Sequence, residues 1–204
     1  MPGSVVDLSG TNLHVPDVIM VDTSILVERL LASFPDGVLP STVAVNAERA
    51  RWFFRTLASS GGIGLVTPTV FTEFIHAAIK ARYKYERRRL GATALQTYGR
   101  PINDWLALYK LDPTILQTYL PVMMQFRLWL TLNGLLILGP EDLTPLDSGR
   151  THGEELVRLV GRYGLDSGDA AILLEARRVN VTDIVTLDAD LRRAQSDFTI
   201  YTWL

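Results

Sequence analysis

The stretch "VIMVDTSILVERL", residues 18–30, decides the fold of this chain. Four apolar residues lead into Asp22, and Thr23 and Ser24 follow before an apolar pattern with helical spacing begins. The apolar run predicts a buried strand over 18–22, apolar on both faces as strands of parallel sheets are. The spacing after it predicts a helix over 23–34. Asp22 could simply cap this helix, or it could be the first acid of a metal site.

The rest of the chain alternates between strand and helix patterns. Short apolar segments predict further strands at 63–66, 134–139, 183–188 and 198–203. Such alternation is typical of an α/β fold in which helices cover a parallel sheet. We therefore expect a single domain over 18–204, preceded by an N-terminal extension over 1–17. Residues 80–133 are predicted to form a helical elaboration within the domain.

Composition limits the classes of function. The 204 residues carry a formal net charge of −2, so any surface that binds nucleic acid must be local. The chain has no cysteine, which excludes disulfides, zinc–thiolate sites and thiol nucleophiles. Its first residues lack the pattern of a signal peptide, and the apolar stretch at 128–139 is shorter than the ~18–20 residues of a membrane span. We therefore expect a soluble, cytoplasmic protein with no membrane segment.

Acidic residues stand at the ends of two of the predicted strands and in the first two turns of two predicted helices. Asp22 ends the first strand, and Asp188 follows the fourth with Asp190 close behind. Glu73 and Asp169 lie in helices that should start at the same edge of the sheet. Because ligands of open α/β sheets bind beyond the carboxyl ends of the strands, we expect these carboxylates to lie close together.

Each acid also has a simpler interpretation. Asp169 stands three residues after Asp166, so the pair could form a capping box at the start of a helix. Asp188 and Asp190 could be ordinary turn residues. Glu73 is harder to explain in this way, because its neighbours are apolar and a buried carboxylate is costly unless it is paired or bound to a metal.

Four carboxylates at one place point to a hard cation. Several carboxylates can share a small space in ionised form only when a cation neutralises them. Oxygen-only ligands favour Mg²⁺ or Mn²⁺, which polarise phosphoryl oxygens and lower the pKa of a bound water. With no cysteine and only three histidines, hydrolysis by metal-activated water is the natural chemistry of this sequence.

Four segments resemble the motifs of the PIN-domain family, the nuclease fold of the VapC-type toxins. They are "VDTSILVERL" (21–30), "TPTVFTEFIHAA" (67–78), "YGLDSGDAAILLEA" (163–176) and "IVTLDADL" (184–191). They occur in the family's order and span residues 18–204. The resemblance implies a Rossmann-like parallel sheet with strand order 3-2-1-4-5. It also implies a Mg²⁺- or Mn²⁺-dependent endoribonuclease that hydrolyses phosphodiester bonds of RNA.

The same resemblance assigns roles to individual residues. It places the catalytic and metal-binding carboxylates at Asp22, Glu73, Asp169 and Asp188. It makes Asp190 an accessory metal ligand, and it makes Ser24 and Thr186 hydroxyls that orient the carboxylates or a water. It further implies the toxin of a type II toxin–antitoxin pair, with an antitoxin protein as a partner and a homodimer as the assembly.

A basic segment, "KARYKYERRRL" at 80–90, follows Glu73 on the same predicted helix. Lys84, Arg87, Arg88 and Arg89 could contact an RNA backbone, with the nearby tyrosines available for stacking. A charge run of this kind could equally be a solvated helix face or a surface for an inhibitory partner.

Two other functions compete with the ribonuclease hypothesis. A phosphatase of the haloacid dehalogenase type also begins with an aspartate at the end of strand one. That chemistry needs a second aspartate two residues later, where this chain has Ser24. The other alternative is a non-catalytic PIN-like scaffold that binds RNA or protein without cutting.

Overall fold

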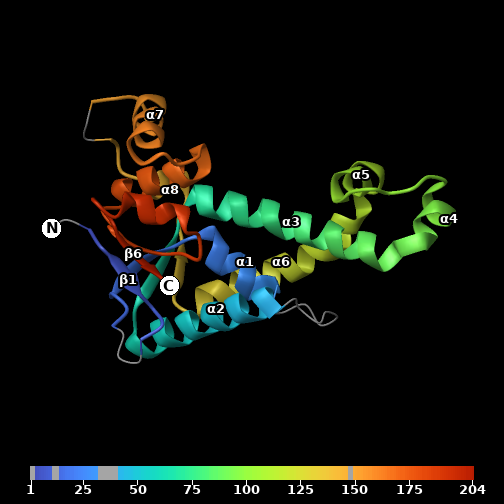
Figure 1. Ribbon diagram of the computed structural model, residues 1–204, viewed down its shortest axis with the longest axis horizontal. Helices are drawn as coiled ribbons and strands as arrows, with labels where there is room; N and C mark the ends of the chain where they lie inside the picture. The colour runs from blue at the N-terminus through green and yellow to red at the C-terminus, as the bar shows by residue number, and fades with distance from the viewer. Residues whose placement is uncertain (1–2, 11–13, 32–40, 147–148) are drawn as a thin grey trace.

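The computed structural model describes residues 3–10, 14–31, 41–146 and 149–204. Within these ranges the chain forms an α/β fold with one all-parallel sheet of six strands, in the order β1-β6-β5-β2-β3-β4 (Figure 1). The strands are β1 (Val5–Asp7), β2 (Val18–Val21), β3 (Ile63–Val66), β4 (Leu135–Ile137), β5 (Asp183–Val185) and β6 (Thr199–Thr202). Residues 32–34 of the helix predicted over 23–34 lie outside the described ranges.

Helices lie on both sides of this sheet. They are α1 (Thr23–Leu31), α2 (Ser41–Ser60), α3 (Pro68–Leu90), α4 (Ala94–Tyr98), α5 (Trp105–Leu111), α6 (Thr114–Leu132), α7 (His152–Tyr163) and α8 (Ser167–Arg178), with 3₁₀ turns at Gly91–Thr93, Pro140–Asp142 and Asp190–Ala194. In Figure 1, α7 and α8 lie on one side of the sheet, and α1 and α2 lie on the other. This arrangement fits a Rossmann-like fold.

The helical middle of the chain extends away from the sheet. Figure 1 shows α3 and α6 running outward side by side, with α4 and α5 near their far ends. The predicted elaboration at 80–133 corresponds to the second half of α3, to α4 and α5, and to α6. The first half of α3 stays with the domain and packs against α1 and α8.

The segment predicted as an N-terminal extension over 1–17 contributes the sixth strand. Val5 pairs in parallel register with Ile200 of β6, and Leu8 joins the core with 3% of its surface exposed. The predicted strand order 3-2-1-4-5 therefore differs from the observed one, because it omits β1 at the edge beyond β6. Within the predicted extension, residues 1–2 and 11–13 lie outside the described ranges.

The central strand, β2, is buried on both faces, as its apolar sequence predicts. Ile19, Met20 and Val21 are all fully buried, and β2 pairs with β3 on one side and with β5 on the other. Because β2 lies inside the sheet, the residue that follows it emerges at the middle of the sheet's carboxyl edge. That residue is Asp22.

The start of α3 is fixed by a contact that comes from another helix. Thr67 occupies the N-cap position and Pro68 the first helical position, but the Thr67 hydroxyl makes no capping hydrogen bond. The carboxylate of Glu175 on α8 instead accepts hydrogen bonds from the Thr69 amide at 3.0 Å and the Thr69 hydroxyl at 2.8 Å. This contact satisfies an amide at the helix start and ties α3 to α8.

Among the helices of the described residues, none combines the length and the apolar character that crossing a membrane requires.

Two isoleucines on neighbouring strands test how much the buried central strand contributes to stability. Ile19 on β2 is fully buried, whereas Ile63 at the start of β3 is 45% exposed. We expect Ile19→Ala to lower the free energy of unfolding by about 2–5 kcal/mol, because it leaves a cavity in the core. Ile63→Ala should cost less than half as much. Urea denaturation of both variants measures the difference, and equal losses would contradict the assignment of β2 to the core.

Candidate active site

Asp22 is a buried carboxylate held by its neighbours at the carboxyl end of β2. Only 4% of its surface is exposed. Its Oδ2 atom accepts hydrogen bonds from the Ser24 hydroxyl at 2.5 Å, the Ser24 amide at 3.2 Å and the Thr186 hydroxyl at 2.8 Å. Asp22 therefore caps α1 and also accepts hydrogen bonds from the two hydroxyls that the family resemblance implies, so capping does not prevent this carboxylate from having a second role.

The same hydroxyls organise the loop that follows β5. The Leu187 amide donates to the Ser24 hydroxyl at 3.0 Å, and the Asp188 amide donates to the Thr186 hydroxyl at 2.8 Å. Each hydroxyl thus bonds both the Asp22 carboxylate and a backbone amide of this loop. The network joins β2 to β5 and places Asp188 next to the end of the central strand.

Glu73 connects α3 to α1 and α8. Its Oε2 atom accepts a hydrogen bond from the Thr23 hydroxyl at 3.0 Å. Its Oε1 atom lies against Gly168 in the first turn of α8, so close that a Cβ atom at Gly168 would stand 2.4 Å from it. Glycine at position 168 therefore makes room for the Glu73 carboxylate.

Asp169 lies in the first turn of α8. Its amide donates to the Asp166 side chain at 2.9 Å, so Asp166 caps α8 as one interpretation of the sequence predicts. Burial raises the pKa of Asp169 to about 7, together with the negative charges of Asp166, Asp188, Asp22 and Glu73. The four predicted acids therefore belong to one electrostatic cluster.

The pKa values of two further acids in the cluster are also raised. Burial raises the pKa of Asp22, although its hydrogen bonds to Ser24 and Thr186 act in the opposite direction. Burial also raises the pKa of Glu73, and the negative charge of Asp22 adds to this effect. Holding all these groups ionised has a cost in free energy that a bound cation would offset.

Asp190, the predicted accessory ligand, has another partner in this structure. Its carboxylate forms an ion pair with Arg193 at 2.8 Å, and its amide donates to the Asp188 side chain at 2.8 Å. The second contact is the side chain–backbone turn that the sequence allows for Asp188 and Asp190.

The basic segment of α3 lies on the part of this helix that extends away from the sheet. Arg87 donates to the backbone carbonyl of Asn103, and Arg89 forms an ion pair with Glu86 at 2.8 Å. Lys84 and Arg88 are exposed. A role in RNA binding stays a prediction for all four basic residues.

The donor chemistry of the cluster suits a hard divalent cation, although the side chains are not gathered into a coordination shell. The donors are carboxylate oxygens supported by hydroxyl groups, which are the ligands that Mg²⁺ and Mn²⁺ prefer. Within residues 3–10, 14–31, 41–146 and 149–204, no group of three or more His, Cys, Asp or Glu side chains is placed to hold a metal ion as the structure stands. Metal binding would thus require the carboxylates to move closer together.

Two contributors to this site were not singled out by the sequence pattern. Thr23 was expected only to begin a helix, but it holds Glu73, and Gly168 gives the Glu73 carboxylate its space. The signal for Gly168 was a glycine beside Asp169 near the start of an otherwise apolar helix. The partner of Thr23 lies 50 positions away and leaves no local signal.

The chain matches no protein-family model, and no curated protein resembles it at a significant level.

The charge on Asp169 should make the metal-free protein less stable as pH rises. Its pKa is about 7 in the folded chain against an ordinary value of 3.8, so the favourable contribution is complete below about pH 4 and is lost as pH rises through 7. Asp169→Asn should therefore raise the free energy of unfolding in EDTA at pH 8 by about 1–2 kcal/mol, after allowance for the partial exposure of this side chain. This gain corresponds to a rise in Tm of roughly 3–6 °C. The gain should be smaller at pH 5.

Adding Mn²⁺ tests whether the Asp169 carboxylate is a metal ligand. In millimolar Mn²⁺ at pH 8 the wild type should gain more in Tm than Asp169→Asn, because the variant has lost a carboxylate ligand. If Asp169→Asn has no higher Tm than the wild type in EDTA at either pH, Asp169 does not belong to a cluster of mutually repelling acids. Differential scanning fluorimetry measures all of these values.

Proposed function

We propose that this protein is a Mg²⁺- or Mn²⁺-dependent endoribonuclease with its active site at the carboxyl edge of the sheet. The observation that carries the proposal is Asp22, a buried carboxylate held by Ser24 and Thr186 beside three further acids. A natural sequence keeps such mutually repelling groups together where function requires them.

In this proposal Asp22, Glu73, Asp169 and Asp188 hold the metal. The bound ion would polarise a phosphoryl oxygen and lower the pKa of an attacking water. Asp22 is the fixed member of the set, because its carboxylate is oriented by neighbouring donors. Thr23 does the same for Glu73, and the N-termini of α1 and α8 favour the ionised carboxylates beside them.

The choice of RNA as substrate, and of a toxin role with an antitoxin partner and a homodimer, rests on the resemblance of the four motifs to the PIN-domain family. The all-parallel sheet is consistent with this resemblance. The cleaved RNA is then the target of the toxin, and the antitoxin is the protein that blocks it.

A non-catalytic scaffold is the second candidate. It is favoured by the spread of the acids, since no three of them in the described residues are placed to hold a metal ion as the structure stands. A scaffold of this kind would bind RNA or protein through the same fold without cutting.

Removing the charge of Asp22 separates the two functions. We expect Asp22→Asn to lower the rate of RNA cleavage in Mn²⁺ by roughly two to four orders of magnitude, because the loss of a metal ligand weakens transition-state stabilisation by several kcal/mol. The measurement is cleavage of a mixed RNA pool, followed on a gel. The matched control is Asp17→Asn, because Asp17 is an exposed acid that precedes the other end of β2.

Equal cleavage by wild type and Asp22→Asn would refute the proposed mechanism. A wild type that binds RNA but does not cut it in Mg²⁺ or Mn²⁺ would establish the scaffold. Ser24→Ala offers an intermediate test, with an expected loss of roughly 10–100-fold, because it removes one orienting hydroxyl and keeps the carboxylate.

A single methyl group at position 168 should disable the site without unfolding the protein. In Gly168→Ala the new Cβ atom would meet Glu73 Oε1, the end of a flexible side chain that can move away. The fold should therefore tolerate the change, and replacing a glycine in a helix can even add up to about 1 kcal/mol of stability. Cleavage should fall at least about tenfold, since Glu73 no longer lies in place.

The matched control for this variant is Gly161→Ala on α7. Gly161 is also a helical glycine, but a Cβ atom there would meet nothing within 4 Å. Both variants should keep or raise Tm, and only Gly168→Ala should lose activity. Full activity in Gly168→Ala would show that the position of Glu73 against α8 does not matter for catalysis.

A further inference from the structure

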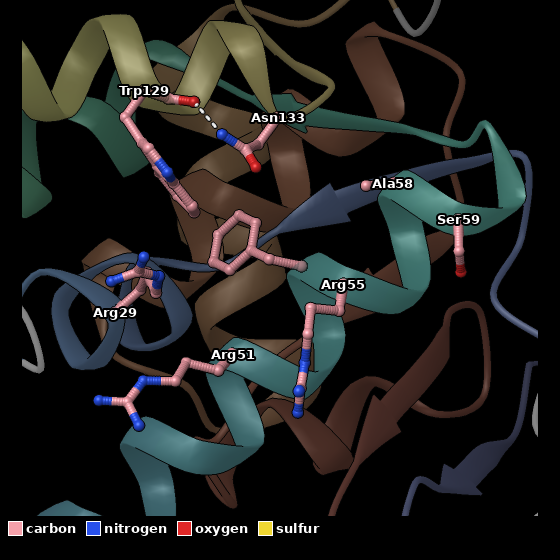
Figure 2. Close-up of a pocket in the computed structure, with 8 residues that line it drawn as sticks. Arg29, Arg51, Arg55, Ala58, Ser59, Trp129 and Asn133 are labelled. Atoms are coloured by element: carbon pink, nitrogen blue, oxygen red, sulfur yellow. Dashed lines mark hydrogen bonds between the residues drawn. The ribbon is translucent and has the colours of Figure 1, made fainter.

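Apart from the acid cluster, the structure has a pocket lined by positive charges between α1, α2 and α6 (Figure 2). The pocket has a volume of about 550 Å³, which is in the range of small-molecule sites. Figure 2 shows Arg29 on α1, Arg51 and Arg55 on α2, and Trp129 on α6. Its lining is completed by Phe54, Ala58, Ser59 and Asn133. We call it the arginine pocket.

An aromatic wall holds Arg29 in this pocket. The guanidinium carbon of Arg29 lies 4.3 Å from the centre of the Trp129 ring, a cation–π contact. Trp129 in turn stacks on Phe126, with ring centres 5.6 Å apart and planes 13° from parallel, and it meets Phe54 edge-on at 5.2 Å. The guanidinium is therefore held in position before any ligand arrives.

The two arginines of α2 share one carboxylate. Arg51 pairs with Glu48 at 2.8 Å, and Arg55 reaches the same side chain at 4.0 Å, so this group of three keeps a net positive charge. Burial lowers the pKa of Arg29, and the positive charge of Arg51 adds to this effect, so these two cations repel each other. An anion entering the pocket would relieve this repulsion.

Arg29 lies on the helix that begins beside the acid cluster. Asp22 directly precedes α1 and Arg29 lies in the last turn of this helix, seven residues later, which corresponds to ~10 Å along the helix axis. The rest of the pocket lies toward the amino edge of the sheet, because Ser59 and Asn133 precede β3 and β4. A bound single strand of several nucleotides can cover such a separation.

We propose that the arginine pocket binds phosphate groups of a single-stranded RNA, further along the strand from the stretch that lies at the acid cluster. Planar guanidinium groups match phosphate oxygens with paired hydrogen bonds. The Trp129 ring is already in contact with the Arg29 guanidinium and with the stacked Phe126 ring, so less of it is left for stacking a base. This favours contacts to the RNA backbone over recognition of a free nucleotide. The proposal rests on RNA being the substrate, but it does not require that the protein cleaves it.

The test is the salt dependence of RNA binding. The double variant Arg51→Gln/Arg55→Gln keeps Arg29 and its aromatic wall, so the fold should persist. Binding of a labelled 12-nucleotide single-stranded RNA is measured by fluorescence anisotropy in EDTA, from 50 to 200 mM NaCl. Each phosphate contact of a single strand contributes about 0.7 to the slope of log K against log salt. The wild type should therefore lose about sevenfold more affinity than the double variant over this range.

Two further variants separate charge from structure. Arg127→Gln removes an arginine from α6 that does not line the pocket, and it should leave the slope unchanged. Glu48→Gln removes the carboxylate shared by Arg51 and Arg55, and it should tighten RNA binding. Loss of a merely structural contact would not improve affinity, so the opposite effects of the two changes support the proposal.

An unchanged slope in Arg51→Gln/Arg55→Gln would overturn the proposal. If the slope is unchanged and adenosine monophosphate raises the Tm of the wild type but not of the double variant, the pocket binds a small phosphate ligand and not RNA. A reduced slope without cleavage in Mn²⁺ supports the arginine pocket and refutes the nuclease, whereas cleavage with an unchanged slope does the reverse. The two proposals can therefore fail separately.

Discussion

The structure depends on the burial of one carboxylate at the end of its central strand. Burial alone would drive Asp22 to its neutral form, and the hydrogen bonds from Ser24 and Thr186 oppose that change. These donors come from the start of α1 and the end of β5, so satisfying one carboxylate fixes the relative positions of three elements. The same two hydroxyls also hold the amides of Leu187 and Asp188, which positions the next acid.

This arrangement lowers the stability of the fold at the place where we propose the chemistry. Burial and the surrounding negative charges raise the pKa of Asp169 to about 7, and replacing the cluster with neutral groups would relieve the repulsion. Gly168 makes the same point in terms of packing. It stands in the first turn of α8, where alanine would favour the helix more, yet its missing side chain is what admits Glu73. Local rules are broken together at one place, which is the usual mark of a functional site.

The sequence predicted the parts of the fold that local patterns determine. The apolar run at 18–22 gave a buried central strand, and the acids after it were predicted to share one edge. β1 was missed because it is a short edge strand whose residues stay partly exposed, so it lacks the apolar run of a central strand. The capping of α3 by Glu175 and the contact from Thr23 to Glu73 were missed for another reason. Both join residues far apart in the chain, and only the folded structure brings them together.

The formal net charge of −2 conceals a separation of charge along α1. The helix starts beside the acid cluster and carries Arg29 in its last turn, where a cation also interacts favourably with the carbonyl end of the helix. One helix of nine residues thus joins a negative site suited to a metal with a positive pocket suited to phosphate. In the proposed nuclease the two sites would act together, since the metal would act on the scissile phosphate while the arginines would neutralise neighbouring phosphates. The net charge of the whole chain does not show where these opposite charges lie.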